Sequence, residues 1–113
     1  KKIIFLLPSN LKNLNLNYDL FVNHESFGEM KIDIVNNYIH QISKKMQHNS
    51  ILFSVNRLSR SVNKWSIDGS HLTNFFEYDL VNFETLLMKI DNFRNLIPRQ
   101  HALPNIIYIG KKI

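Results

Sequence analysis

Four consecutive side chains of different chemistry follow an apolar run at Tyr18–Val22, and they are Asn23, His24, Glu25 and Ser26. An imidazole can take up a proton near neutral pH, since its reference pKa is about 6.5. A positioned acid–base group of this kind contributes about 10²–10⁴-fold to a reaction rate. We therefore interpret His24 as a candidate general base, with Glu25 or Glu29 orienting it or binding a substrate hydroxyl. The alternative is that His24 and Glu25 only cap the helix that follows.

The elements on either side of these residues predict a crossover between two parallel strands. Tyr18–Val22 and Ile51–Val55 are short apolar runs that end in polar residues, which is typical of buried strands. Between them, apolar residues recur three and four positions apart, which predicts an amphipathic helix over Lys31–Gln47 with a stop near Asn49. Two such strands joined by a helix favour a parallel pair in an α/β sheet.

Further short runs extend the predicted sheet at both ends of the sequence. Ile3–Leu7 is apolar and is followed by a turn, so it predicts a strand buried on both faces. Phe83–Ile90 favours a strand by its alternation, and Ile106–Ile109 predicts a last strand after a loop over 93–103. The sequence between 59 and 70 is polar. The fold class expected is α/β, with a strand, a strand, a helix and a strand followed by a final antiparallel strand pair.

Polar residues end the other predicted strands as well. In open α/β sheets, ligands bind at the carboxyl ends of the strands. Asn56 and Arg57 follow one strand, and an Arg offers five donors in a fixed fork for a hydroxyl or a phosphate. The remaining strand-end candidates are Pro8, Ser9 and Asn10 after the first strand and Arg94, Arg99 and His101 in the loop before the last. Plain turns and solvated side chains are the alternative readings of these positions.

Composition narrows the class of protein. The chain has 113 residues, of which 44% are hydrophobic, so it is long enough for one small domain with a core. It has no Cys, which excludes disulfides and thiolate metal sites, and its five His residues do not form a metal motif. No apolar run approaches the roughly 20 residues of a membrane-spanning helix. A cytoplasmic protein without a metal or a membrane partner is expected.

Four segments together are similar to the sugar O-methyltransferase family, which belongs to the class I S-adenosylmethionine-dependent methyltransferases. The segments are FLLPSNL, YDLFVNHESFGEM, IVNNYIHQI and ILFSVNRLSR, which cover roughly Ile3 to Arg60. The resemblance implies a Rossmann-like methyltransferase sheet, S-adenosylmethionine as cofactor and a sugar or glycan hydroxyl as acceptor. It also implies roles for individual residues: cofactor contacts at Pro8, Ser9, Asn10 and Asn23, and substrate contacts at Ser26, Asn56, Arg57 and Arg99.

The chain departs from that family in its glycines. Class I methyltransferases hold the cofactor with a glycine-rich loop after the first strand and an acidic residue after the second. The three glycines of this chain, Gly28, Gly69 and Gly110, are not arranged in that way. The resemblance therefore implies the C-terminal portion of a longer enzyme, with the glycine-rich first unit in a missing N-terminal half. We expect weak S-adenosylmethionine binding, or none, by these 113 residues alone.

Two other functions stay open at this point. The run from Ile51 to Ser61 resembles the strand and Arg-Leu-Ser-Arg-Ser segment of serine recombinases, with Ser9 in the position of a nucleophile. That resemblance implies a domain that acts on DNA. The formal net charge of +5 and the many Asn residues are also compatible with an RNA-binding or ribosomal component.

Overall fold

Four strands and one α-helix form the part of the chain that the computed structural model describes, which is residues 17–58, 74–91 and 104–113. In chain order the elements are β1 (Tyr18–His24), the 3₁₀ turn η2 (Phe27–Glu29), α1 (Ile32–Lys45), β2 (Met46–Arg57), the 3₁₀ turn η3 (Phe75–Glu77), β3 (Phe83–Asp91) and β4 (Asn105–Lys112). The strand predicted over 3–7, the polar segment over 59–70 and the loop predicted over 93–103 lie outside these residues.

The strands form one mixed sheet in the order β1-β2-β4-β3. β1 and β2 are parallel, and β4 is antiparallel to both β2 and β3. The predicted parallel pair joined by a helix is confirmed, and so is the final antiparallel pair. The sequence did not predict that β4 would lie between β2 and β3. Because β4 reverses direction, β3 runs in the same direction as β1 and β2.

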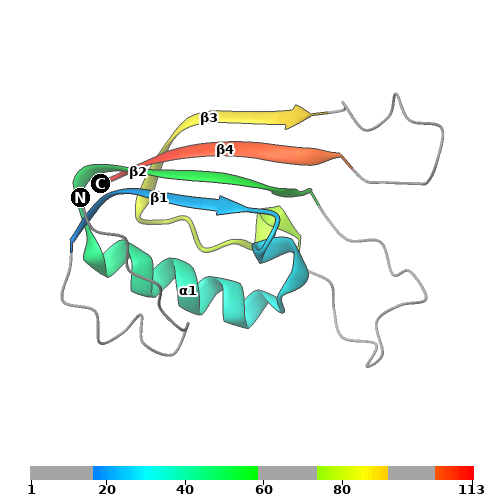
Figure 1. The fold of residues 1–113 in the computed structure, drawn as a ribbon, viewed down its shortest axis with the longest axis horizontal. Helices are drawn as coiled ribbons and strands as arrows, with labels where there is room; N and C mark the ends of the chain where they lie inside the picture. Colours follow the sequence, from blue (N-terminus) through cyan, green and yellow to red (C-terminus); the bar gives the residue numbers. More distant parts are fainter. Residues whose placement is uncertain (1–16, 59–73, 92–103) are drawn as a thin grey trace, which may run out of the picture.

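α1 packs along one face of this sheet, below the strands in Figure 1. Its buried side chains include Val35, Ile39 and Ile42, as the three and four spacing predicted. Asp33 in the first turn and the Lys residues in the last turn suit the helix dipole. The predicted helix was too long, however, because α1 ends at Lys45 and Met46 already belongs to β2.

The start of β2 explains this difference at the helix end. Met46 pairs with Tyr18, whereas the next paired positions are Leu20 and Ile51, so β2 carries extra residues between the two pairs. Asn49 lies in this irregular stretch with a φ of 69°, a left-handed conformation that Asn tolerates better than most residues. Met46 therefore belongs to β2 and does not continue α1, because it pairs with Tyr18. Asn49, the expected helix stop, lies in the bulge of β2.

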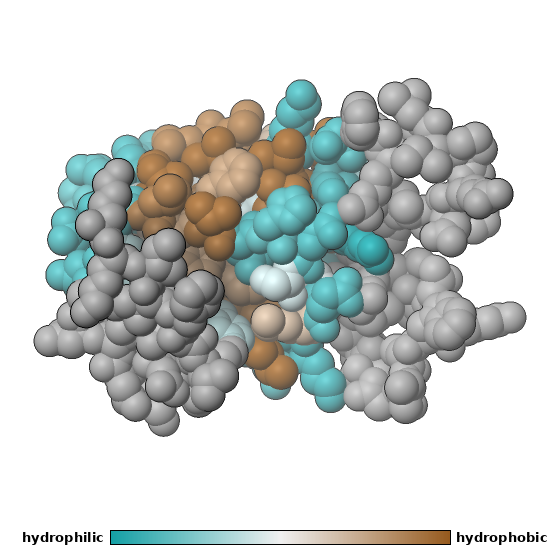
Figure 2. All heavy atoms as spheres, in the orientation of Figure 1, coloured by the Kyte–Doolittle hydropathy of each residue, from teal (hydrophilic) through white to brown (hydrophobic). Residues whose placement is uncertain are grey.

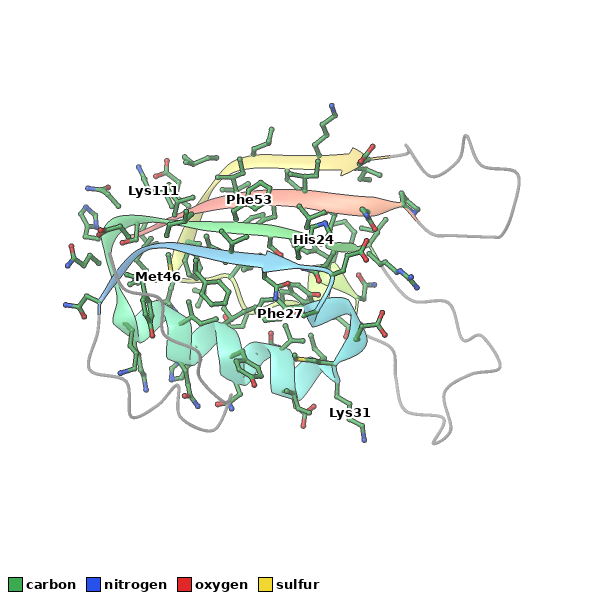
Figure 3. All side chains as sticks on the ribbon, in the orientation of Figure 1. His24, Phe27, Lys31, Met46, Phe53 and Lys111 are labelled. Carbon is green, nitrogen blue, oxygen red and sulfur yellow. The ribbon has the colours of Figure 1, made fainter. Side chains whose placement is uncertain are left out.

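The hydrophobic core lies between α1 and the sheet. Phe27 and Met46 are labelled there in Figure 3, on the side of the strands that faces the helix. The core residues share an exposed fraction below 9%, and they are Phe27, Val35, Ile39, Ile42, Met46, Leu52, Phe75, Tyr78, Phe83, Ile106 and Tyr108. Within residues 17–58, 74–91 and 104–113, no helix is long and apolar enough to cross a membrane.

The expectation that Ile51–Val55 is a buried strand needs correction. Only alternate residues of β2 are buried, and these are the ones that face α1, including Leu52 and Ser54. The neighbours on the other face, among them Phe53 and Val55, are partly exposed. A strand is buried on both faces only where elements cover both sides of the sheet, and α1 covers one side.

Candidate functional site

The polar ends of the strands gather at one edge of the sheet. β1 and β2 are parallel, so their carboxyl ends at His24 and Arg57 lie at the same edge. β4 begins there, because Asn105 pairs with Arg57, and β3 ends there, because Asp91 pairs with Asn105. The prediction that one sheet edge collects these groups is thus met for the ends that the structure describes.

A buried hydrogen-bond network joins the ends of β1 and β2 beneath this edge. The Asn56 side chain is 0% exposed, and its Nδ2 donates to Asn23 Oδ1 at 2.8 Å and to Ser54 Oγ at 2.7 Å. Asn56 Oδ1 accepts from the backbone N–H of Gly28 at 3.0 Å. Buried amides that are satisfied in this way hold their neighbours in a fixed geometry. Asn56 therefore connects the second strand to the turn that follows the first.

Asn23 completes the connection from the β1 side. Its Nδ2 donates to Ser26 Oγ, and its Oδ1 also accepts a longer bond of 3.4 Å from the Phe27 backbone N–H. The side chain is 6% exposed. Both amides had been predicted as ligand contacts, Asn23 for a cofactor and Asn56 for a substrate. In this structure their polar atoms bind the protein itself, which makes them supports of the turn.

The turn between β1 and η2 presents Glu25 in an unusual backbone conformation. Its φ is 58°, in the left-handed region that non-glycine residues seldom adopt. The Glu25 N–H donates to Val55 O at 2.7 Å, which fixes the turn to β2. Such conformations persist where the surrounding structure enforces them, and they often occur at functional sites. The carboxylate is half-buried, and its Oε1 accepts from Asn105 Nδ2 at 3.5 Å.

His24 stands beside this turn with an exposed side chain (Figure 3). It pairs with Val55, and Arg57 follows Val55 by two positions, so His24 and Arg57 project from the same face of the sheet. Asn105 pairs with Arg57 and shares that face as well. The edge therefore brings an imidazole, a guanidinium and an amide together on one side of the sheet, next to the Glu25 carboxylate.

Ser26 and Glu29 lie in the same turn, and both are exposed. Ser26 precedes η2 and accepts from Asn23, and the Glu29 N–H donates to Ser26 O at 3.2 Å. Of the predicted site residues, Pro8, Ser9, Asn10 and Arg99, with the loop candidates Arg94 and His101, lie outside the described ranges. No grouping of His, Asp and Glu in the described parts of the chain has the composition of a metal site.

An aromatic cluster supports the turn from the core side. The Phe27 ring lies 6.4 Å from Phe21, 6.4 Å from Tyr38 and 6.0 Å from Tyr78, measured between ring centroids. Such ring pairs contribute about 0.5–1.5 kcal/mol beyond the area they bury. Burial raises the pKa of the Tyr78 hydroxyl, so this ring stays neutral at physiological pH. The turn that carries His24 and Glu25 is thus held by packing as well as by hydrogen bonds.

Sequence reasoning missed Asn105 as a member of this site. It directly precedes the predicted last strand, Ile106–Ile109, and was not singled out as a site residue. Its position beside Glu25 depends on the antiparallel pairing of Asn105 with Arg57 across β2 and β4, which joins residues far apart in the sequence. The signal that could have identified Asn105 is its polar side chain at the start of a strand. That strand begins at the edge where the neighbouring strands have their carboxyl ends.

Comparison with known proteins shows a likeness of fold. TehB from Haemophilus influenzae has a solved structure that matches this chain with a TM-score of 0.64 at 14% sequence identity. The match covers 96% of this chain and 40% of the TehB chain, so the chain spans less than half the length of TehB. The likeness shows that this chain shares its fold with part of the TehB chain. No protein-family model and no curated protein sequence matches the chain.

Proposed function

We propose that this chain is part of a longer S-adenosylmethionine-dependent methyltransferase that acts on a hydroxyl group of a sugar. The fold likeness to TehB supports methyl transfer as the general reaction, and the sugar acceptor follows from the resemblance of the sequence segments. The observation that carries the proposal is the turn after β1. It holds an exposed imidazole beside a carboxylate at the carboxyl edge of a sheet with a methyltransferase fold.

The groups at this edge have complementary tasks in the proposed reaction. His24 is exposed and accepts the proton of the acceptor hydroxyl, while Glu25 binds a neighbouring hydroxyl or stabilises the charged imidazole. Arg57, on the same face as His24, donates to further hydroxyls of the acceptor. Ser26 and Glu29 lie in the same turn and are exposed to an acceptor. Asn23 and Asn56 keep these groups in position, because a displacement of about 1 Å can cost about 10²-fold in rate.

We infer that the described residues supply only part of a cofactor site. A Cβ atom at Gly28 would meet its nearest neighbour, the Arg57 backbone nitrogen, at 3.7 Å, which is an ordinary van der Waals contact. The amide of Asn23, predicted to contact the cofactor, is bonded to Ser26 and Asn56. S-adenosylmethionine, the methyl donor, would therefore be held largely by other parts of the enzyme. The chain's own contribution is acceptor binding and proton uptake.

The test uses the polypeptide encoded by the complete reading frame that contains this sequence. Methyl transfer from radiolabelled S-adenosylmethionine is measured with a panel of sugar acceptors. His24→Ala is expected to lower turnover by about 10²-fold or more, since a positioned acid–base group contributes about that much. His40→Ala is the matched control, because His40 is an exposed histidine on α1, away from the strand ends.

Two results would contradict the proposal. If no acceptor in the panel receives the label, methyl transfer to sugars is wrong. If His24→Ala melts several degrees lower but transfers methyl groups at the parent rate, His24 is only a structural residue. The proton would then pass to Glu25, to Glu29 or to a residue elsewhere in the enzyme.

A further inference from the structure

β3 ends the sheet on the side away from α1, and its apolar side chains are exposed (Figure 1). Among the described strands it has one neighbour, β4. Figure 2 shows hydrophobic residues gathered at this upper side of the molecule. Four large apolar side chains of β3 are 42–53% exposed, and they are Leu86, Leu87, Met88 and Ile90. Proteins usually pair, cover or charge an edge strand of this kind, because it otherwise binds other chains.

The exposed apolar residues of β3 lie on both faces of the sheet. Paired residues on neighbouring strands present their side chains on the same face. Met88 pairs with Tyr108, a core residue on the α1 side, whereas Leu87 pairs with Ile109 and lies on the opposite side. Ile90 shares the α1 side with Met88. An element packed on one face would cover only part of this set, but a strand paired along the edge extends both faces at once.

The backbone of β3 turns a row of hydrogen-bonding groups to its outer edge. The N–H of Ile113, just after β4, donates to Asn82 O at 3.1 Å, so every second residue of β4 faces β3. The intervening residues of β4 face β2, and the residues of β3 opposite them turn their N–H and C=O groups outward. These residues of β3 are Phe83, Thr85, Met88 and Ile90.

We propose that β3 pairs with β3 of a second copy of the chain. The two strands run antiparallel about a two-fold axis at Leu87, which joins the two sheets into one continuous sheet. Such an interface is self-complementary, because each copy offers the same strand to the other. In this register Leu87 lies opposite itself, Glu84 opposite Lys89, Thr85 opposite Met88 and Phe83 opposite Ile90. The last two pairs, which occur twice, exchange the outward backbone groups as hydrogen bonds.

A bulge in β3 makes this register fit on both faces. Thr85 pairs with Gly110 and Leu87 with the preceding residue of β4, Ile109, so Leu86 is an extra residue. The extra residue brings Glu84, Leu87 and Lys89 to the same face of the sheet. Residues opposite each other in a ladder must share a face, and Glu84 meets this condition with Lys89 only because of the bulge.

Charge selects this register over its neighbours. Opposite charges directly across two strands are stabilising and like charges are destabilising. With the axis at Leu87, the pair of Glu84 and Lys89 occurs twice in the interface. An axis at Met88 would place Glu84 opposite Asp91 of the second copy, and an axis at Lys89 would place two lysines opposite each other.

The net charge of the chain does not prevent this contact. Each copy has a formal net charge of +5, which opposes association in general. Charges more than about 8 Å apart are largely screened at physiological ionic strength, whereas pairs in contact are screened less. Glu84 also binds Lys111 of its own chain at 2.5 Å, so its carboxylate would lie between two ammonium groups.

The paired strands leave the candidate site outside the interface. Because the two copies are antiparallel, the carboxyl edges of their sheets lie at opposite ends of the joined sheet. His24 and Arg57 belong to β1 and β2, which β4 separates from β3. Dimer formation is therefore independent of methyl transfer, and each can fail without the other.

A disulfide across the two-fold axis tests the register in the polypeptide of the complete reading frame. The 113 residues contain no Cys. Leu87 faces β4 with its backbone groups, so it forms a non-hydrogen-bonded pair with its copy, with Cα atoms about 4.5 Å apart. A disulfide accepts Cα separations of about 4.4–6.8 Å. We expect Leu87→Cys to form a linked dimer on mild oxidation, whereas Val81→Cys, at a residue that is 73% exposed and precedes β3, does not.

Sedimentation measures the contribution of the apolar and charged pairs. We expect the parent polypeptide to be a dimer at about 100 μM and Leu87→Lys to raise the dimer Kd about 10²-fold or more. Lys89→Glu should raise it about tenfold, because both charge pairs become repulsive. Lys44→Glu makes the same charge change at an exposed position of α1 and should not raise the Kd.

Three results would overturn the proposal. The first is a parent polypeptide that sediments as a monomer at about 100 μM. The second is a dimer that persists in Leu87→Lys, and the third is equal cross-linking of the two Cys variants. The melting temperature of each variant checks its fold. If Leu87→Lys does not fold, Lys89→Glu and Leu87→Cys still decide the question.

Discussion

Replacement of Asn56 by Ala tests whether the buried amide network holds the turn that carries His24 and Glu25. The substitution removes three hydrogen bonds of 2.7, 2.8 and 3.0 Å and leaves the buried N–H of Gly28 without its acceptor. An unsatisfied buried group costs about 1–3 kcal/mol, and each of the other two bonds contributes about 1 kcal/mol. We therefore expect the free energy of unfolding to fall by roughly 3–5 kcal/mol, a large fraction of the stability of a small domain.

Urea denaturation followed by circular dichroism measures this change, and Asn37→Ala is the matched control. Asn37 is an exposed residue of α1 that accepts a bond of 3.3 Å from Gln41, so its loss should change stability by less than about 0.5 kcal/mol. The Gly28 amide resonance should also shift in Asn56→Ala alone. If both variants unfold at the same urea concentration, the network does not stabilise the turn and the positions of His24 and Glu25 need another explanation.

Three further predictions concern the core and the cofactor. Gly110→Ala should lower the free energy of unfolding by about 1–3 kcal/mol, because the new Cβ would lie 2.6 Å from the Tyr108 hydroxyl oxygen. Gly28→Ala should change the urea midpoint little, because the nearest neighbour of its new Cβ would be 3.7 Å away. The free energy of unfolding should fall as the pH rises above about 10. Tyr78 ionises there in the unfolded chain, whereas burial raises its pKa and keeps it neutral in the folded chain. Tyr78→Phe should make that fall less steep and leave neutral-pH stability intact, since the Tyr78 hydroxyl has no hydrogen-bond partner among the described residues. Calorimetry should detect no micromolar binding of S-adenosylmethionine to the 113-residue chain, and a clear micromolar isotherm would contradict the incomplete cofactor site.

Local patterns were enough to predict the elements but not their order in the sheet. The spacing of Val35, Ile39 and Ile42 and the alternation in Phe83–Asp91 are local properties, so helix and strand follow from them. The insertion of β4 between β2 and β3 depends on pairing between distant residues, for which the sequence has no local signal. Met46 shows the same limit, because helical spacing included it and pairing with Tyr18 moved it to the strand.

The site was predicted where its residues follow directly from strand ends. His24, Glu25 and Arg57 were placed at one edge, and the parallel pairing brings β1 and β2 to that edge. Asn56 was read as a ligand contact because it also ends a strand. Successive residues of a strand point to opposite faces, so Asn56 is buried on the α1 side of β2 whereas Arg57 lies on the other face. The sequence does not show which face of a strand is buried when both faces carry apolar and polar residues.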